Sequence, residues 1–127
     1  MIGIVDYGLG NVQAFANIYR RLGIAVMLAK SEKELQSATR IILPGVGAFD
    51  WAMERLEASG MRAMLDKRVM SDRIPVLGVC VGMQIMARRS EEGSLPGLAW
   101  IEADVKRFEE NCFSGRVQLP HMGWNDA

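Results

Sequence analysis

Histidine and cysteine are scarce in this chain of 127 residues, which contains one histidine and two cysteines. A metal site built from clustered histidine and cysteine side chains is therefore not expected, because such sites need several ligands together. The two cysteines, Cys80 and Cys112, are not spaced as a CxxC pair. This pattern predicts free thiols in a reducing cytoplasm rather than a disulfide framework.

The sequence also lacks a long apolar run and an excess of charge of either sign. No stretch approaches the roughly 18 apolar residues of a membrane-spanning helix, and the chain begins with a strand-like segment, so neither a span nor a signal peptide is expected. Fifteen basic and fifteen acidic residues cancel, so no net field draws the chain to nucleic acid or to a membrane surface. The composition, 50% hydrophobic and 24% charged, predicts one globular cytoplasmic domain over residues 1–127.

Strand and helix patterns alternate along the first three quarters of the chain. Apolar runs predict strands at residues 2–5, 24–29, 40–43 and 74–79. Helical patterns lie between them: residues 12–22 behind the N-cap Asn11, 31–38 behind a capping-box sequence, 50–60 with Asp50 as the cap, and 61–69. Such alternation through short turns indicates right-handed βαβ units, and hence a three-layer α/β fold with a mainly parallel sheet.

The last part of the chain has a different pattern. Apolar and charged residues alternate over 101–105, which suits a half-exposed antiparallel strand, and residues 117–125 resemble another strand that enters a turn. In a parallel sheet, functional groups gather at the carboxyl ends of the strands. Three segments qualify: residues 6–11, residues 44–49, and Cys80 with its neighbours.

Cys80 lies in the sequence Gly-Val-Cys-Val-Gly, residues 78–82, between an apolar run and an amphipathic run over 83–89. This is the pattern of a nucleophile on a sharp strand-to-helix turn. Gly78 and Gly82 remove Cβ atoms where the strand and helix backbones approach and the nucleophile is strained. A helix that starts near Val81 would favour the thiolate. The alternative is a small buried cysteine at a strand end.

Two other glycine-rich turns have different predicted roles. Residues 44–47, Pro-Gly-Val-Gly, follow a strand, and their backbone N–H groups could form an oxyanion hole together with that of Val81. Residues 8–13 resemble a dinucleotide fingerprint, but Gln13 replaces its third glycine. A tight strand–helix turn is therefore the favoured interpretation there, and nucleotide binding is the alternative.

Four segments occur together in one order: Asp-Tyr-Gly-Leu-Gly-Asn at 6–11, Leu-Pro-Gly-Val-Gly-Ala-Phe at 43–49, Gly-Val-Cys-Val-Gly-Met-Gln at 78–84 and Leu-Pro-His-Met-Gly-Trp-Asn at 119–125. With them, the chain resembles the glutamine amidotransferase subunits of imidazole glycerol phosphate synthases, within the class I (triad) amidotransferases. The resemblance covers essentially the whole chain and corresponds to the N-terminal part of the family domain, incomplete at its C-terminus.

The resemblance implies hydrolysis of L-glutamine to glutamate without a cofactor. The ammonia would pass to a (β/α)₈-barrel cyclase or synthase subunit, the partner in a heterodimer of histidine biosynthesis. By matching position, Cys80 would form a γ-glutamyl thioester. The oxyanion would be held by Val46, Gly47 and Val81, and the glutamine by Gly45, Gly47 and Gln84. Residues facing the partner would be Tyr7, Gly8, Asn11, Pro120, His121, Met122, Gly123, Trp124 and Asn125.

One departure from the family pattern concerns the catalytic triad, which the family completes with an H-x-E sequence well downstream of the cysteine. The only histidine here, His121, is followed by Met122 and Gly123. The chain by itself is therefore expected to be inactive. Two alternatives remain open: a paralogous subunit that supplies ammonia for surface-sugar biosynthesis, and a non-catalytic fragment that binds a partner.

Overall fold

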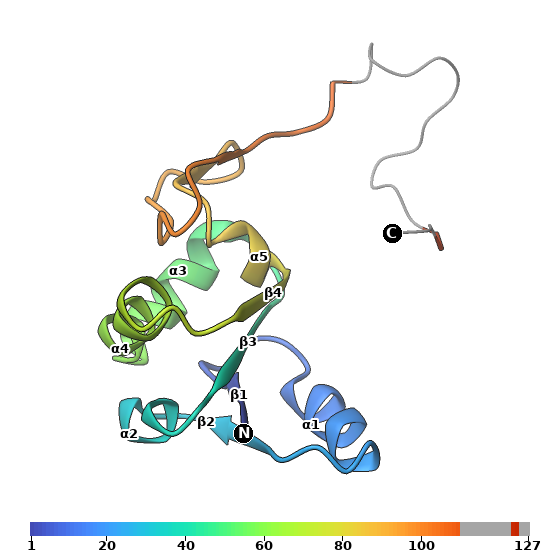
Figure 1. The fold of residues 1–127 in the computed structure, drawn as a ribbon. Helices are drawn as coiled ribbons and strands as arrows, with labels where there is room; N and C mark the ends of the chain where they lie inside the picture. The colour runs from blue at the N-terminus through green and yellow to red at the C-terminus, as the bar shows by residue number, and fades with distance from the viewer. Residues whose placement is uncertain (110–122, 125–127) are drawn as a thin grey trace.

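The computed structural model describes residues 1–109 and 123–124. Four short strands form the main sheet: β1 (Ile2–Val5), β2 (Val26–Ala29), β3 (Arg40–Gly45) and β4 (Val76–Cys80). They lie in the order β2-β1-β3-β4, and every neighbouring pair is parallel. The chain leaves each strand through one or more helices before it forms the next (Figure 1). This arrangement confirms the predicted parallel α/β fold.

Helices cover both faces of the sheet and make the three predicted layers (Figure 1). On one face lies α1 (Val12–Arg21), whose Ala16 packs with Ile4 and Ile42 in a small apolar cluster. The other face carries α2 (Glu32–Gln36), α3 (Phe49–Ala58), α4 (Arg62–Asp66) and the π-helical turn η1 (Lys67–Ser71). Fully buried side chains from this layer, including those of Phe49 and Leu65, form the larger core with the sheet. Burying each such side chain contributes about 1.5–3 kcal/mol.

The predicted helix caps are observed in part. Asn11 caps α1 as predicted, because its Oδ1 accepts from the Ala14 N–H at 3.1 Å. At α2 the capping box is half formed: the Ser31 hydroxyl donates to the Glu34 carboxylate at 3.0 Å instead of accepting from the helix backbone. The prediction for Asp50 is wrong. Ala48 is the N-cap of α3, and Asp50 lies inside the first turn with its carboxylate turned to another loop.

Two predicted boundaries differ near the expected site. Strand β3 continues through the predicted stop at Pro44, because its pairing with β4 extends to the partners Gly45 and Cys80. The helix after Cys80, α5 (Val81–Gln84), ends well before Arg89. The carbonyl oxygens of residues 85, 86 and 88 accept hydrogen bonds from residues 98, 101 and 97 instead of continuing the helix. A contact from a later part of the chain therefore ends α5.

The segment after α5 also departs from expectation. Strand β5 (Arg89–Ser90) pairs with β6 (Asp104–Val105) in a parallel register, so the predicted antiparallel strand over 101–105 is wrong. The intervening loop returns the chain in its original direction, which gives a parallel pair. Most of the predicted strand at 117–125 lies outside the described residues, as does Cys112. None of the helices in the described part is long and apolar enough to span a membrane.

Candidate active site

Cys80 is the last residue of β4 and directly precedes α5. Its backbone has φ +54° and ψ −124°, a conformation that residues other than glycine rarely adopt. The thiol is free and exposed. A strained, exposed cysteine between a strand and a helix is the predicted nucleophile geometry, whereas the buried structural cysteine of the alternative interpretation is not observed.

Close backbone packing explains the glycines around Cys80. A Cβ atom on Gly78 would lie 2.5 Å from the Met83 Cα, and one on Gly82 would overlap the carbonyl oxygen of Leu43. A Cβ atom on Gly45 would likewise overlap the backbone nitrogen of Gly82. The ends of β3 and β4 and the start of α5 therefore pack backbone against backbone. Gly45 is buried in this contact, and its predicted role in holding glutamine stays a prediction.

The turn after β3 lies beside Cys80 because Gly45 and Cys80 are register partners. Val46 and Gly47 are exposed there, and Gly47 has φ +92°. The other predicted contributor to the oxyanion hole, Val81, follows Cys80 in the chain and has a buried side chain. The structure thus brings the three predicted oxyanion residues to one end of the sheet. Their role with substrate stays a prediction.

The Tyr7 side chain is hydrogen-bonded to the backbone at the end of β3, just before this turn. Its side chain is only 3% exposed, and its hydroxyl donates to the Pro44 carbonyl oxygen at 2.6 Å. Burial raises the pKa of Tyr7 to about 12, so the hydroxyl keeps its proton. The prediction that Tyr7 faces a partner therefore needs correction for the side chain, which anchors the end of β3 instead.

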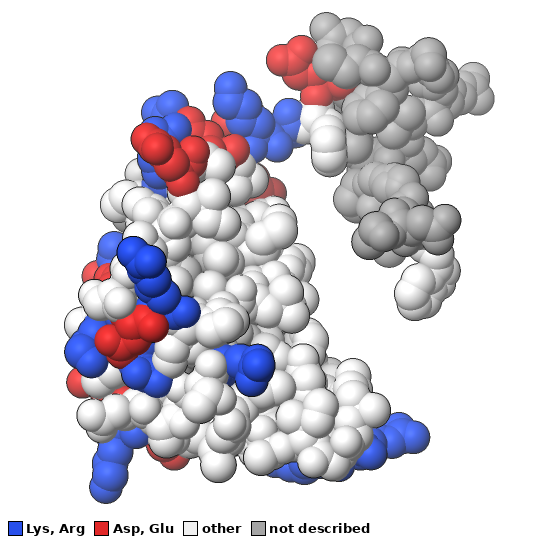
Figure 2. Space-filling model, viewed as in Figure 1, with Lys and Arg blue, Asp and Glu red and all other residues white. Residues whose placement is uncertain are grey.

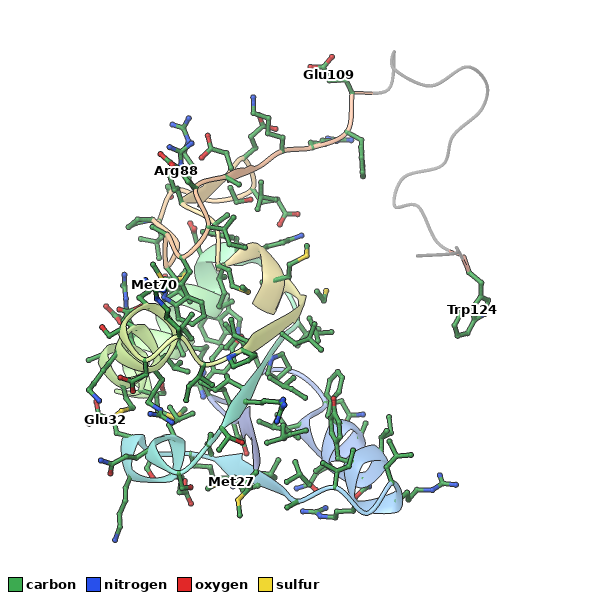
Figure 3. The ribbon with its side chains drawn as sticks, in the orientation of Figure 1. Met27, Glu32, Met70, Arg88, Glu109 and Trp124 are labelled. Atoms are coloured by element: carbon green, nitrogen blue, oxygen red, sulfur yellow. The ribbon has the colours of Figure 1, made fainter. Side chains whose placement is uncertain are left out.

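The other predicted partner-facing residues fall into two groups. Gly8, Asn11, Gly123 and Trp124 are exposed, and the Trp124 side chain lies apart from the helices and sheet (Figure 3). Pro120, His121, Met122 and Asn125 lie outside the described residues. At the Gly8 turn, a Cβ atom on Gly8 would overlap the guanidinium of Arg55. Gly8 itself has φ +89°, a backbone conformation typical of a tight turn.

A cavity of about 620 Å³ opens at the end of α5, a size typical of small-molecule sites. Gln84, the last residue of α5 and four residues after Cys80, lines this cavity. The Gln84 Oε1 is buried and has no hydrogen-bond partner among the described residues.

Sequence reasoning missed the rest of the cavity wall. It is lined by Ser90, Glu91, Glu92, Val105, Lys106, Arg107 and Phe108. These residues flank β5 and β6, whose parallel pairing brings two distant parts of the chain together. No local motif marks them. The only sequence signal was the cluster of charges beside short β-like stretches, which is also typical of an ordinary solvated surface.

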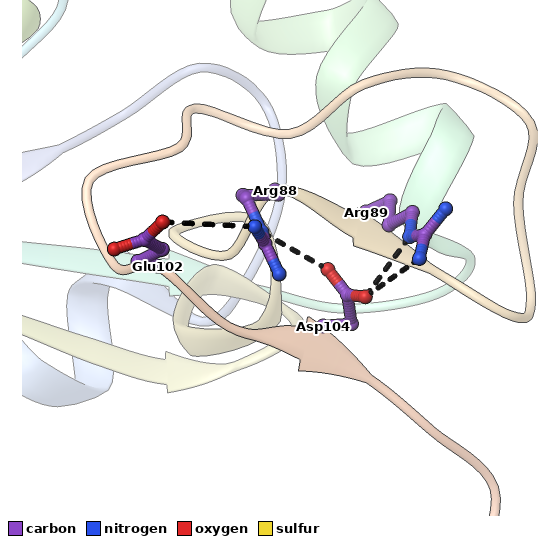
Figure 4. Close-up of polar contacts among 4 residues, drawn as sticks. All are labelled: Arg88, Arg89, Glu102 and Asp104. Carbon is purple, nitrogen blue, oxygen red and sulfur yellow. Dashed lines mark hydrogen bonds and ion pairs between the residues drawn. The ribbon is translucent and has the colours of Figure 1, made fainter.

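Ion pairs connect β5 and β6, the two strands that line this cavity (Figure 4). Asp104 accepts from the Arg89 Nε at 3.0 Å and from the Arg88 Nε at 3.2 Å. The Arg89 hydrogen bond is the main cause that lowers the pKa of Asp104 below its ordinary value. A further bond, from the Arg107 N–H to the Glu91 carboxylate at 2.9 Å, joins the segments after each strand. The described residues contain no cluster of His, Cys, Asp and Glu suited to a metal ion.

Known proteins resemble this chain over its whole length. The family profile described as "Glutamine amidotransferase class-I" matches residues 3–126. The protein named "Imidazole glycerol phosphate synthase subunit HisH" from Bdellovibrio bacteriovorus is 58% identical over 127 residues. Its namesake from Leptospira interrogans is 52% identical. Both matches cover 100% of this chain and 62% of the relative. The chain thus spans less than two thirds of the length of these curated relatives.

A solved structure gives independent support for the fold. The structure titled "Crystal structure of glutamine amidotransferase" matches with a TM-score of 0.69 at 24% identity. The match covers 84% of this chain and 56% of that one. These comparisons agree with the resemblance inferred from the four sequence segments.

Proposed function

Because this chain belongs to the class-I glutamine amidotransferase family, we propose that it supplies the nucleophile and the oxyanion-binding turn of a glutaminase site. The observation that carries this proposal is the exposed Cys80 at φ +54°, beside the turn at Gly47 and directly before the short helix that ends at Gln84. A strained elbow is maintained only when the surrounding packing enforces it, and such strain is concentrated at functional sites.

The proposed reaction is a two-step acyl transfer. The Cys80 thiolate attacks the side-chain amide carbon of L-glutamine, and the backbone N–H groups of Gly47, Val46 and Val81 stabilise the resulting oxyanion. The C–N bond then breaks, ammonia leaves with an added proton, and a γ-glutamyl thioester remains on Cys80. Water hydrolyses the thioester to glutamate and regenerates the thiol. The family resemblance assigns the proton transfers to an H-x-E pair, a pattern that His121 does not form.

The cavity beside Gln84 suits the rest of the substrate. Glutamine carries an α-ammonium group and an α-carboxylate, and the cavity wall offers groups of both charges in Glu92 and Lys106. Gln84 lines the same cavity with a side-chain amide that can bond to a polar group of the substrate. We therefore propose that glutamine occupies this cavity and that its side-chain amide extends past Gln84 toward Cys80, which does not itself line the cavity.

We further propose that the ammonia serves an imidazole glycerol phosphate synthase of histidine biosynthesis in the cytoplasm. The names of the relatives, up to 58% identical, favour this role over surface-sugar biosynthesis. The partner would be a (β/α)₈-barrel cyclase subunit that meets the exposed turn at Gly8 and Asn11 and the segment with Trp124. The strained Cys80 elbow disfavours a purely non-catalytic role, because partner binding alone requires no such strain.

The test compares two cysteine variants of the full-length protein in the presence of the cyclase subunit. Cys80→Ser should abolish glutamate and ammonia release, whereas Cys112→Ser should keep it. Cys112 is the matched control, because two carboxylates precede it in Glu109-Glu110-Asn111-Cys112 and disfavour a thiolate. Mass mapping after treatment with a glutamine-like electrophile should find the label on Cys80. Preferential labelling of Cys112, or turnover by Cys80→Ser, would overturn the assignment.

A further inference from the structure

We propose that Asp50 is a positioning residue that holds the cavity wall at residues 90–92 in register with the turn that carries Gly47. The inference rests on the proposed function, because it concerns how the same site binds glutamine. Asp50 belongs neither to the cysteine elbow nor to the glycine turn.

The Asp50 carboxylate binds a loop that is distant in sequence. One oxygen, Oδ2, accepts from the Ser94 N–H at 2.9 Å and from the Ser94 hydroxyl at 3.2 Å. The other oxygen, Oδ1, accepts from the Leu95 N–H at 3.0 Å. Both oxygens are therefore engaged, and these backbone bonds lower the pKa of Asp50 below its ordinary value. Asp50 stays ionised and bound at neutral pH.

The loop is shaped to fit around this carboxylate. A Cβ atom on Gly93 would overlap the Asp50 Oδ1 and would lie 2.8 Å from its Cγ. It would also lie 3.2 Å from the Phe49 Cδ1. Residue 93 can approach the start of α3 this closely only without a side chain. The contact is thus a packed junction and not a chance approach of two surface groups.

The junction connects two parts of the proposed site. On one side, Asp50 lies in the first turn of α3, close behind Gly47, and the neighbouring Phe49 is fully buried. On the other side, the turn from Ser90 to Gly93 is closed by its own bonds, from the Glu92 N–H to the Ser90 hydroxyl at 3.1 Å and from the Gly93 N–H to the Ser90 carbonyl at 3.3 Å. A rigid turn held at Asp50 fixes Ser90, Glu91 and Glu92 on the cavity wall.

A simpler role for Asp50 would be a negative charge at the start of a helix, which is stabilising in itself. The two roles differ in what they require. A helix-start charge needs only a carboxylate in the first turn, whereas positioning needs both oxygens at fixed places. Asp50→Glu keeps the charge and displaces the carboxylate by one methylene. Asp50→Asn keeps the shape and replaces one acceptor oxygen by an NH₂ group.

The experiment uses the full-length protein and measures glutamine turnover in each variant. Asp50→Asn and Asp50→Glu should each raise KM for glutamine by about tenfold while kcat stays within about threefold, because the cavity wall shifts and Cys80 does not. Gly93→Ala should do the same from the opposite side of the junction. Glu54→Gln, an exposed carboxylate on the same helix, is the matched control and should leave KM unchanged.

A second readout separates positioning from general destabilisation. In Asp50→Asn, the rate of Cys80 labelling by a glutamine-like electrophile should fall about tenfold relative to labelling by iodoacetamide, which needs no cavity. Equal changes with both reagents, or a wild-type KM in Asp50→Glu, would overturn the positioning role. If the wild-type protein shows no preference for the glutamine-like reagent at Cys80, the proposed function itself fails and the role of Asp50 fails with it.

Discussion

At the scale of single residues, the candidate site depends on the unusual backbone conformations of Cys80 and Gly47. Cys80 at φ +54° and Gly47 at φ +92° both lie in a region that side chains rarely adopt, and both sit where β3 and β4 end. The glycines at 78 and 82 let α5 start directly behind the cysteine. Each of these residues could be picked out from the sequence, because a turn this tight restricts the residue types that fit. The hydrogen bond from Tyr7 to Pro44 could not be predicted from the sequence, because the two residues are distant in the chain.

Gly47→Ala in the full-length protein should reduce glutamine turnover by about 10²–10³-fold, because an oxyanion donor would be displaced. The nearest atom to a new Cβ would be the Trp51 Cδ1 at 4.0 Å, so no clash opposes the substitution. The positive φ should nevertheless lower stability by about 1–2 kcal/mol. Steady-state kinetics and thermal melting measure the two effects separately.

Gly60→Ala is the matched control for that prediction. Gly60 has φ +72° and open space around its Cα, but it lies at the far end of α3. It should lose a similar amount of stability and keep full turnover. If Gly47→Ala behaves like Gly60→Ala, the glycine is needed only for the shape of the turn.

His121→Ala should keep basal glutaminase activity in the full-length protein. A general base must reach the thiol within about 2.6–3.2 Å and usually needs a partner that orients it. The sequence Pro120-His121-Met122-Gly123 supplies no neighbouring carboxylate. Instead, we expect glutamine hydrolysis to be coupled less tightly to the cyclase reaction. This is measured as the fraction of the ammonia that escapes to solution. Complete loss of basal turnover would instead make His121 the base.

At the level of helices and strands, the sequence predicted those parts that local patterns determine. The four strands of the main sheet and the cap of α1 follow from apolar runs and from Asn11. The end of α5 and the β5–β6 pair depend on hydrogen bonds between residues 85–91 and 97–105, which no local pattern encodes. Asp50 shows the same limit, because its position suggests a helix cap while its partners are Ser94 and Leu95.

The β5–β6 pair should respond to loss of Asp104. Asp104→Asn removes the charge that holds Arg88 and Arg89 together (Figure 4). Amide hydrogen exchange should then accelerate at Arg88 and Glu91, whose N–H groups donate to the carbonyl oxygens of Ala103 and Val105, and KM for glutamine should rise severalfold. Asp72→Asn is the control, because Asp72 pairs with Arg68 and Lys67 away from the cavity. Equal exchange rates in the wild-type protein and in Asp104→Asn would show that Asp104 does not stabilise the β5–β6 pair.

The same contact predicts a pH dependence with a definite sign. The folded pKa of Asp104 is lowered, so its contribution to stability is present above the ordinary pKa of an aspartate, about 4. That contribution is lost as the pH falls through the lowered folded value. Exchange at the Arg88 and Glu91 amides should accordingly stay slow between pH 5 and 8, after correction for intrinsic rates, and should rise on acidification below about pH 4. Asp104→Asn should show no such rise.

Across the whole molecule, β4 is an edge strand of the described sheet. Its Leu77 is 54% exposed, although it belongs to an apolar run. On the face drawn in Figure 2, uncharged side chains cover most of the surface, and charged ones gather mainly at the left and top, with one basic group in the lower middle. An exposed edge with apolar side chains can pair with another copy of itself. The 127-residue chain should therefore self-associate, and Leu77→Lys should reduce this more than Leu22→Lys, which changes an exposed leucine at the end of α1.

The same chain by itself should show no meaningful glutaminase activity, whether or not it associates. In the proposed reaction Cys80 and the Gly47 turn begin the attack, but a proton must reach the departing ammonia and another must leave the attacking water. Each such transfer is worth roughly 10²–10⁴-fold in rate, and the sequence contains no H-x-E pair to perform them. Ammonia release should be measured with the chain alone, with the cyclase subunit added, and with the full-length protein. Steady Cys80-dependent turnover by the chain alone would show that a residue within it performs both proton transfers.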